Sequence, residues 1–382
     1  MAIIRVDVRP ELLHWACDRA GDRKTALREK FALEAWIKGD TKPTLKQLEE
    51  FARAARVAVG YLFLQEPPEE ALPIRDMRTI GSRRVRRPSP DLLDMIYLFQ
   101  QRQEWYREFA EQHGHDPIRF VGSATLSDIA ADVAATIRQT LNFEMAARWD
   151  CDTPSDLMRL FVERVELAGV LVMVSGVVKN STNRVLDPGE FRGFALADSL
   201  APVVFVNGND GKPAQMFTLA HELAHLWLGE SALSDVTLNT AASNETEKWC
   251  NQVAADVLVP IAQLMKMAIA DEDPLDQLDD FRKAFKVSRQ VILRRLLDAK
   301  LISRTQFDKA YALAISQVTA SKPKSSGGDF FNTLPVRASK RLVKALVAST
   351  SAGETLYSEA FHLLGIRSMR TMRGIGERVG DE

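Results

Sequence analysis

The sequence predicts an α+β fold that is mostly helical, with one small β-sheet near the middle of the chain. Apolar residues recur at helical spacing over most of the 382 residues. Three short β-branched or aromatic runs, separated by Gly, Asn, Asp and Pro, instead read as strands at 170–178, 191–196 and 203–206. This length, with 46% hydrophobic and 26% charged residues, suits two to four compact units.

Composition excludes several classes of protein. Fifty Lys and Arg against 51 Asp and Glu give a net charge of −1, which excludes a globally basic nucleic-acid coat. Cys17, Cys151 and Cys250 are too few and too scattered for a disulfide framework, which predicts a reducing, cytoplasmic location. The N-terminus lacks the apolar core of a secretory signal, and no apolar run approaches the ~20 residues that span a bilayer. We therefore expect no membrane partner.

The first predicted domain covers residues 1–75. Short helical patterns at 24–31 and 33–38 precede a longer one at 44–55. Gly39 can end the second helix in a turn, and Thr44 is a good N-cap for the third. Four or five short helices with tight turns in this length are typical of an all-α helix-turn-helix domain.

The charge of this domain is mixed. A helix-turn-helix reads DNA with the start of its second helix, supported by basic contacts to phosphate. The candidate segment, 32–38, carries Glu34, and its Trp36 is expected in the core. Acids also alternate with the nearby bases, which are Arg23, Lys24, Arg28, Lys30, Lys42 and Lys46. We predict weak DNA binding at most, and a docking or dimerisation role remains an equal alternative.

Four further domains are predicted: a helical connector at 76–150, a mixed core at 151–272, a helical subdomain at 273–320 and a helical C-terminal domain at 328–382. A Pro-rich linker at 65–73 and a flexible Gly- and Ser-rich segment at 321–328 separate some of them. The basic run at 83–87 is interpreted as a solvated or salt-bridged linker rather than a phosphate contact. The helices expected in these domains cover 91–114, 127–141, 154–168, 213–228, 246–258, 261–270, 275–285 and 288–299.

The pentapeptide His221-Glu222-Leu223-Ala224-His225 lies in an apolar helical context. Residues four apart in a helix lie nearly over one another, with Cβ atoms about 6 Å apart, so the two imidazoles can bind one ion. Glu222 can reach a water in the open position of that ion. Zinc with such a ligand set lowers the pKa of the water to about 7, and the carboxylate then accepts the proton as the water attacks a peptide carbonyl. The motif predicts Zn²⁺ at His221 and His225, with Glu222 as general base.

The third ligand must come from elsewhere. The helix that begins near Asn244 offers Glu245, Glu247, Cys250 and Asp256. Carboxylate is the usual partner of two histidines in metallopeptidases, which favours Glu247 or Glu245 over Cys250. The segment from Asn244 to Glu247 also fits a capping box, in which the acid bonds back to the backbone. Spacing alone does not choose between ligation and capping.

These residues resemble the ImmA/IrrE metallopeptidases. The resemblance rests on the motif His221 to His225, on the preceding segments 203–207 and 216–220, and on 247–255 as far as Pro260. In that family the helix after the zinc motif carries a pattern close to E-x-x-A-N-x-F-A-A, whose Glu is the third zinc ligand. The resemblance therefore implies that Glu247 binds zinc and places Asn251 on the Asn of the pattern. Departures from it are confined to two packing positions, Cys250 and Val253.

Resemblance extends to the ends of the chain. Trp36, Gly39 and the pair Pro43-Thr44 are similar to an XRE-type helix-turn-helix. The family implies a zincin-like core and zinc-dependent endoproteolysis of a partner protein, typically a transcriptional repressor. It also suggests that a second helix-turn-helix-like segment at 285–295, with Ser288 as N-cap, is structural rather than a DNA reader.

Three alternatives stay open. The chain can be a DNA-binding regulator whose metallopeptidase fold senses metal without cleaving, although Glu222, which zinc binding does not need, argues against this. The strand at 203–206 is either an edge strand that pairs with a substrate backbone or an ordinary sheet strand. The polar segment at 231–244 is either a lid or a surface loop.

Overall fold

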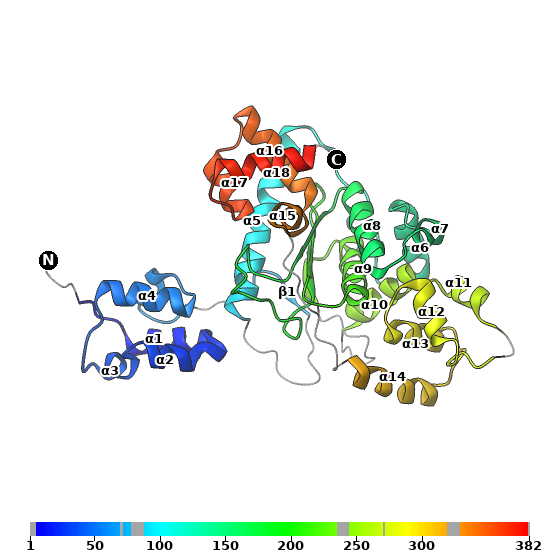
Figure 1. Cartoon of the computed structure of the whole chain (residues 1–382), viewed down its shortest axis with the longest axis horizontal. Helices are drawn as coiled ribbons and strands as arrows, with labels where there is room; N and C mark the ends of the chain where they lie inside the picture. Colours follow the sequence, from blue (N-terminus) through cyan, green and yellow to red (C-terminus); the bar gives the residue numbers. More distant parts are fainter. Residues whose placement is uncertain are drawn as a thin grey trace. The chain divides into compact units, whose positions relative to one another are not determined.

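The computed structural model of the chain describes residues 5–68, 72–77, 88–234, 244–269, 272–318 and 329–380 (Figure 1). It forms two compact units. Unit 1 comprises Met1–Pro73 with Arg86–Ile96, and unit 2 comprises Ile74–Val85 with Tyr97–Glu382. The finer limits of the five domains stay a prediction, and the basic run at 83–87 and the segment at 321–328 lie outside the described residues.

Unit 1 is helical and has its own hydrophobic core. Thr44 caps the fourth helix through a capping box with Gln47, because its hydroxyl accepts from the Gln47 amide at 3.2 Å. Gly39 ends the third helix with a φ of +80°, a conformation that glycine adopts without strain. Trp36 is 6% exposed and packs edge-to-face on Phe51, which confirms it as a core residue. The helices are α1 (Pro10–Arg19), α2 (Lys24–Lys30), α3 (Leu33–Lys38) and α4 (Leu45–Ala55), with the 3-10 helices η1 (Gly21–Arg23) and η2 (Val59–Phe63).

Unit 2 contains a five-stranded mixed sheet in the order β1-β5-β3-β4-β2. Strand β2 pairs with β4 in parallel, β3 is antiparallel to both β4 and β5, and β1 is parallel to β5. The three predicted strands are present, whereas β1 and β5 were not predicted because they are only two and three residues long. The strands are β1 (Arg75–Asp76), β2 (Leu171–Ser175), β3 (Gly193–Leu196), β4 (Val203–Asn207) and β5 (Ala232–Ser234).

One expectation about this sheet is wrong. Strand β4 is not an edge strand, because β2 pairs with it on one side and β3 on the other. All five of its residues are buried, and its backbone groups already take part in two ladders. The strand at 203–206 therefore cannot pair with a substrate backbone.

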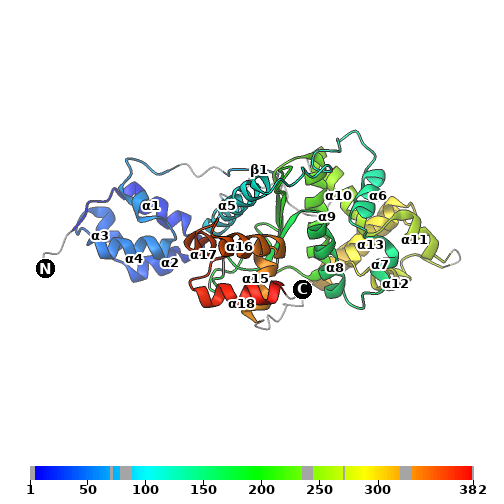
Figure 2. The same cartoon turned by 90° about the horizontal axis from the view of Figure 1, so that it is seen from above.

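Helices cover both faces of the sheet. Figure 1 and the turned view of Figure 2 show α8 and α9 on one side of the strands, and α5 and α15 on the other. The alternation of side chains explains the arrangement: Phe194 and Phe205 meet Phe99 of α5 at ring distances of 5.3 and 5.2 Å. Their neighbours Ala195 and Val204 instead join the apolar core that includes the buried side of α9. Helix α9 is thereby fixed against β3 and β4.

The helices of unit 2 follow the predicted pattern closely. Individual ranges were not predicted for α7, α14 and α15–α18, which lie in regions predicted only as helical. The helices of unit 2 among the described residues are α5 (Pro90–Gln112, whose first residues belong to unit 1), α6 (Ala130–Thr140), α7 (Met145–Trp149), α8 (Pro154–Leu167), α9 (Lys212–Leu228), α10 (Glu245–Leu258), α11 (Ile261–Met267), α12 (Leu278–Phe285), α13 (Arg289–Asp298), α14 (Arg304–Val318), α15 (Phe330–Ala338), α16 (Lys340–Ala352), α17 (Tyr357–Leu364) and α18 (Met369–Gly380).

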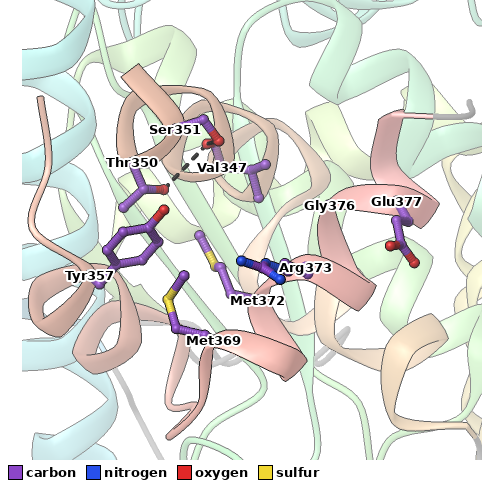
Figure 3. Close-up of a pocket in the computed structure, with 9 residues that line it drawn as sticks. All are labelled: Val347, Thr350, Ser351, Tyr357, Met369, Met372, Arg373, Gly376 and Glu377. Atoms are coloured by element: carbon purple, nitrogen blue, oxygen red, sulfur yellow. Dashed lines mark hydrogen bonds between the residues drawn. The ribbon is translucent and has the colours of Figure 1, made fainter. Parts of the chain in front are cut away.

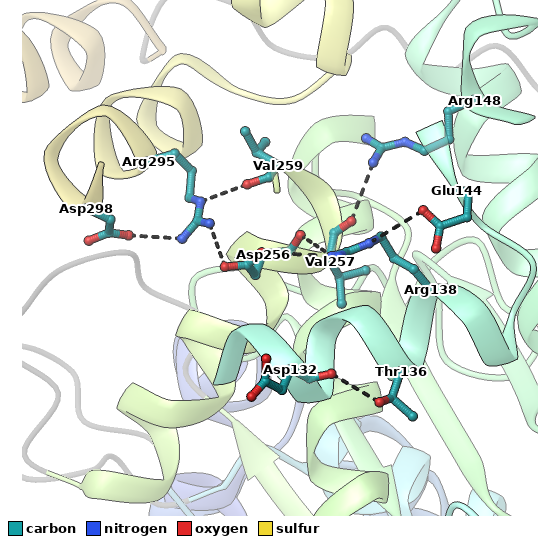
Figure 4. A network of polar contacts seen from close by, with 10 residues as sticks. All are labelled: Asp132, Thr136, Arg138, Glu144, Arg148, Asp256, Val257, Val259, Arg295 and Asp298. Atoms are coloured by element: carbon teal, nitrogen blue, oxygen red, sulfur yellow. Dashed lines mark hydrogen bonds and ion pairs between the residues drawn. The ribbon is translucent and has the colours of Figure 1, made fainter. Parts of the chain in front are cut away.

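Three buried arginines hold the C-terminal end of α10 (Figure 4). The Arg138 guanidinium donates to the carbonyl of Asp256 at 2.7 Å, and Arg148 donates to that of Val257 at 3.4 Å. Arg295 of α13 donates to the Val259 carbonyl at 2.8 Å and to the Asp256 carboxylate at 2.6 Å. The last carbonyls of a helix have no partner within it, so these arginines complete α10 and join α6, α7 and α13 to it.

Asp256→Ala should therefore destabilise unit 2 strongly. Its carboxylate is 11% exposed, and removing it leaves the buried charge of Arg295, 3% exposed, with the Asp298 carboxylate at 3.3 Å as its remaining ion-pair partner. We expect the free energy of unfolding to fall by about 3 kcal/mol, the lower end of the range for removing one member of a buried ion pair, because Asp298 still faces Arg295. Urea denaturation measures the change. In the control, Asp279→Ala breaks an exposed pair with Arg289 and should change stability by about 1 kcal/mol or less; equal effects of the two variants would contradict the prediction.

The start of α16 is fixed by a buried acid of α8. The hydroxyl of Ser339, whose φ is +68°, donates to the Glu166 carboxylate and also caps α16. Burial raises the pKa of Glu166 to about 7 despite this bond and those from the Lys340 and Arg341 amides. Glu166 thus attaches the C-terminal helices to α8.

Stability should consequently depend on the pH through Glu166. The pKa of the folded state, about 7, exceeds the ordinary value of 4.5, so the folded state binds the proton more tightly. This contribution to stability is full below pH 4.5 and is lost as the pH rises through about 7. Glu166→Gln keeps an acceptor for Ser339 but does not titrate. We expect thermal unfolding of the variant to depend less on pH across this window than that of the wild type; parallel pH profiles would contradict the assignment.

A small cavity lies among the C-terminal helices (Figure 3). Its volume is about 240 Å³, and α16, α17 and α18 supply all of its lining residues. Tyr357 and Met369 on its rim are 42% and 36% exposed, so the cavity opens to solvent. No residue of the His221–His225 motif lines it, and it is separate from the site described below.

Candidate metal centre

Helix α9 carries the motif and is buried along most of its length. Every residue from Gln215 to Trp227 is buried, and Gly229 ends the helix with a φ of +73°. Pro213 lies in its first turn, where the missing N–H has no helical partner to lose. Polar groups in such a buried helix must be paired or hold an ion.

The two histidines of α9 meet Glu247 from the first turn of α10. The Nε2 atoms of His221 and His225 lie 3.2 Å apart. The Glu247 carboxylate places Oε1 3.2 Å from Nε2 of His225 and Oε2 3.4 Å from Nε2 of His221. All three side chains are at most 2% exposed. They are the only group of three or more metal-ligating side chains found among the described residues.

These atoms fit a zinc ion. Four ligands placed tetrahedrally about 2.0–2.2 Å from zinc lie about 3.3–3.6 Å from one another, close to the distances between the three side chains. The Nδ1 atom of His221 lies 3.1 Å from Oδ1 of Asn251, which fixes the proton on Nδ1 and leaves Nε2 with a lone pair facing the cluster. Within the described residues, buried Oε2 of Glu247 has no hydrogen-bond donor. A cation at the centre would satisfy all three groups.

The protonation states also suit a metal. Burial lowers the pKa of His225, which favours the neutral ring that binds metals. Burial alone would raise the pKa of Glu247, but the adjacent imidazoles of His221 and His225 outweigh it and lower this pKa to about 2. The cluster thus combines an anionic carboxylate with basic ring nitrogens.

Glu222 lies against strands β3 and β5. Its Oε2 accepts a hydrogen bond from the Ser234 hydroxyl of β5 at 3.3 Å. A Cβ atom on Gly193 of β3 would lie 3.0 Å from Oε1 of Glu222 and 2.7 Å from the Phe205 carbonyl oxygen, so only glycine fits there. Burial, and then the charge of Glu247, raise the pKa of Glu222 well above its ordinary value. A bound cation would oppose that shift by favouring the ionised carboxylate.

The other candidate ligands lie apart from the cluster. Glu245 is exposed, Asp256 is paired with Arg295, and Cys250 is buried outside the group. The capping interpretation of Glu247 is wrong: the Asn244 side chain accepts from the Thr246 amide at 3.0 Å, and the Glu247 carboxylate faces the histidines instead.

Sequence reasoning missed two neighbours of Glu222. Ser234 and Gly193 carry no motif, and their positions follow only from the pairing of β3 with β5. Residues 232–234 form a strand, so the interpretation of 231–244 as a lid or loop is wrong for that part. Residues 235–243 lie outside the described part of the chain.

A buried pair of histidines and a glutamate, on two helices beside a small mixed sheet, defines a metallopeptidase domain with a candidate metal site of the HExxH type. The family model described as IrrE N-terminal-like domain (Peptidase_M78) matches residues 168–297, which include His221, His225 and Glu247. The chain therefore carries an IrrE N-terminal-like domain with this triad. This match bears out the IrrE-like metallopeptidase domain predicted for the central third of the chain, and the N-terminal helix-turn-helix stays a prediction.

A second model, described as Domain of unknown function (DUF8813), matches residues 338–378. No curated protein and no solved structure matches the chain. None of the described helices combines the length and the apolar character needed to cross a bilayer.

Proposed function

We propose that the chain is a zinc-dependent endopeptidase that cleaves a partner protein, a transcriptional repressor. The observation that carries this proposal is the convergence of His221, His225 and Glu247 with a further buried carboxylate, Glu222, on the same helix as the histidines. Zinc, when bound, acts as a Lewis acid and lowers the pKa of a bound water to about 7. The repressor as substrate is supported by the resemblance to the ImmA/IrrE metallopeptidases.

The chain's own residues have distinct roles in this proposal. Three side chains hold the ion, and Asn251 orients the ring of His221. Glu222 accepts the proton of the attacking water and passes it to the leaving amine. Ser234 holds the Glu222 carboxylate in place from β5.

Unit 1 is proposed to be an XRE-type helix-turn-helix domain that docks a partner or binds DNA weakly. Its bases are largely engaged: Lys24 pairs with Asp18 at 2.5 Å, and Lys42 pairs with Asp7 at 2.7 Å. Arg23 donates to the Ala54 carbonyl at 2.8 Å. Few positive charges remain to neutralise phosphates, so any DNA binding should be weak at physiological salt.

Two measurements on the purified protein test the proposed function: its zinc content, and cleavage of a cognate transcriptional repressor. We expect one zinc per chain and one or a few discrete repressor fragments. Tight, sequence-selective DNA binding near physiological salt, together with an intact repressor, would instead identify a DNA-binding regulator that senses metal without cleaving.

A further inference from the structure

The outermost strand of the sheet comes from the segment that directly follows unit 1. Arg75 and Asp76 pair in parallel with Ala232 and Leu233 of β5, and the Met77 amide donates to the Leu233 carbonyl at 2.9 Å. Both residues of β1 are exposed, whereas Met77 is 4% exposed. Strand β1 thus occupies the backbone groups along the outer side of β5.

Strand β5 is also the strand that contacts the general base. Ser234 donates to Glu222, and its partner in the ladder is Gly193, the glycine against which Glu222 lies. The opposite edge of the sheet, β2, is fully buried and is contacted by α8 and α15. Among the described strands, the outer side of β5 is therefore the sheet edge next to the site.

An extended peptide binds a sheet edge through the row of N–H and C=O groups on that edge, whichever direction it runs. Strand β1 already uses this row on β5. A second peptide can pair there only after β1 leaves. Because β1 is two residues long with exposed side chains, and continues from the end of unit 1 at Pro73, it is suited to displacement.

We propose that β1 is a self-inhibitory strand: residues 75–77 cover the edge of β5 to which the substrate backbone binds, and cleavage requires their release. This inference rests on the proposed endopeptidase function. It also gives unit 1 a regulatory role, because a partner that binds unit 1 and draws the chain after Pro73 away from β5 would activate the site.

A matched pair of variants of the full-length protein tests the proposal. Met77→Pro removes the amide that bonds to Leu233, and Met77→Ala removes the same side chain but keeps that amide. We expect deuterium exchange at residues 232–234, and cleavage of labelled casein as an unstructured probe, to be roughly fivefold faster or more in Met77→Pro than in Met77→Ala, the change expected for one lost hydrogen bond. A hexapeptide with the sequence of residues 72–77 should inhibit Met77→Pro, and a scrambled hexapeptide should not.

Each remaining outcome is decisive. Faster exchange in Met77→Pro with no gain in cleavage would overturn the inference, while wild-type cleavage that is lost in Glu222→Gln would still support the proposed function. Equal exchange in the two variants would also overturn it, since β1 would then be a permanent strand. If no variant cleaves casein or the repressor although zinc is bound, the proposed function fails and the inference fails with it.

Discussion

Glu222→Gln is expected to abolish cleavage while leaving zinc content and folding unchanged. Glutamine has the size of glutamate and still accepts a hydrogen bond from Ser234, but it cannot take up a proton. General-base catalysis typically contributes about 10²–10⁴-fold to a rate, and we expect a loss of at least this size. Stability should not fall, because burial disfavours the charged form of this residue and the neutral amide avoids that penalty.

The measurements are the cleavage rate of the repressor, the zinc-to-protein ratio and the midpoint of thermal unfolding. Glu166→Gln is the matched control, since it also neutralises a buried glutamate of unit 2 but one that contacts Ser339 rather than the site. It should cleave at the wild-type rate. Undiminished cleavage by Glu222→Gln would exclude Glu222 as the general base, and loss of zinc would assign it a role in binding the ion.

Glu247→Ala should lose zinc. The change leaves His221 and His225 as the only ligands in the cluster, and a structural or catalytic zinc site needs at least three from the protein. We expect zinc affinity to fall by about 100-fold or more, since even residues that only orient zinc ligands contribute 10–100-fold. Glu245→Ala is the control: it lies two residues away on the same helix turn but is exposed.

Metal analysis after dialysis, and competition with a chromogenic chelator, measure both variants. Helix capping does not confound the result, because Asn244 performs it through the Thr246 amide. Equal zinc content in Glu247→Ala and the wild type would exclude Glu247 as the third ligand.

Periodicity predicted the helices of the site well, because the apolar residues of a helix such as α9 recur at helical spacing over many consecutive positions. The short strands β1 and β5 were missed for the opposite reason. Each has at most three residues, and each forms only because a strand distant in the sequence supplies backbone hydrogen-bond partners. The error about β4 has the same origin: position within a sheet depends on which strands pair, and the sequence of 203–206 contains no such information.

The choice between two roles for Glu247 was likewise not decidable from spacing. A glutamate at the third position of a helix fits both a capping box and a ligand set, and the competing carboxylates lie on the same helix. Tertiary contacts settle the geometry. The side chain of Asn244 caps the start of α10, and Arg295 binds the carboxylate of Asp256. Of the competing carboxylates, that of Glu247 lies beside the histidines.

Helix α10 carries Glu247 in its first turn, and three buried arginines bind the carbonyls at its end, so an ion bound at the cluster would be connected to α13 through this one helix. A metal ion that binds only when α10 and its neighbours are folded stabilises those helices. By linkage, loss of their packing lowers the affinity of the site for the ion. Chelation should loosen the packing of α13, and warming that frees α13 should in turn release the ion. The occupancy of the metal site should therefore report on the packing of α13, although α13 supplies none of the three candidate ligands.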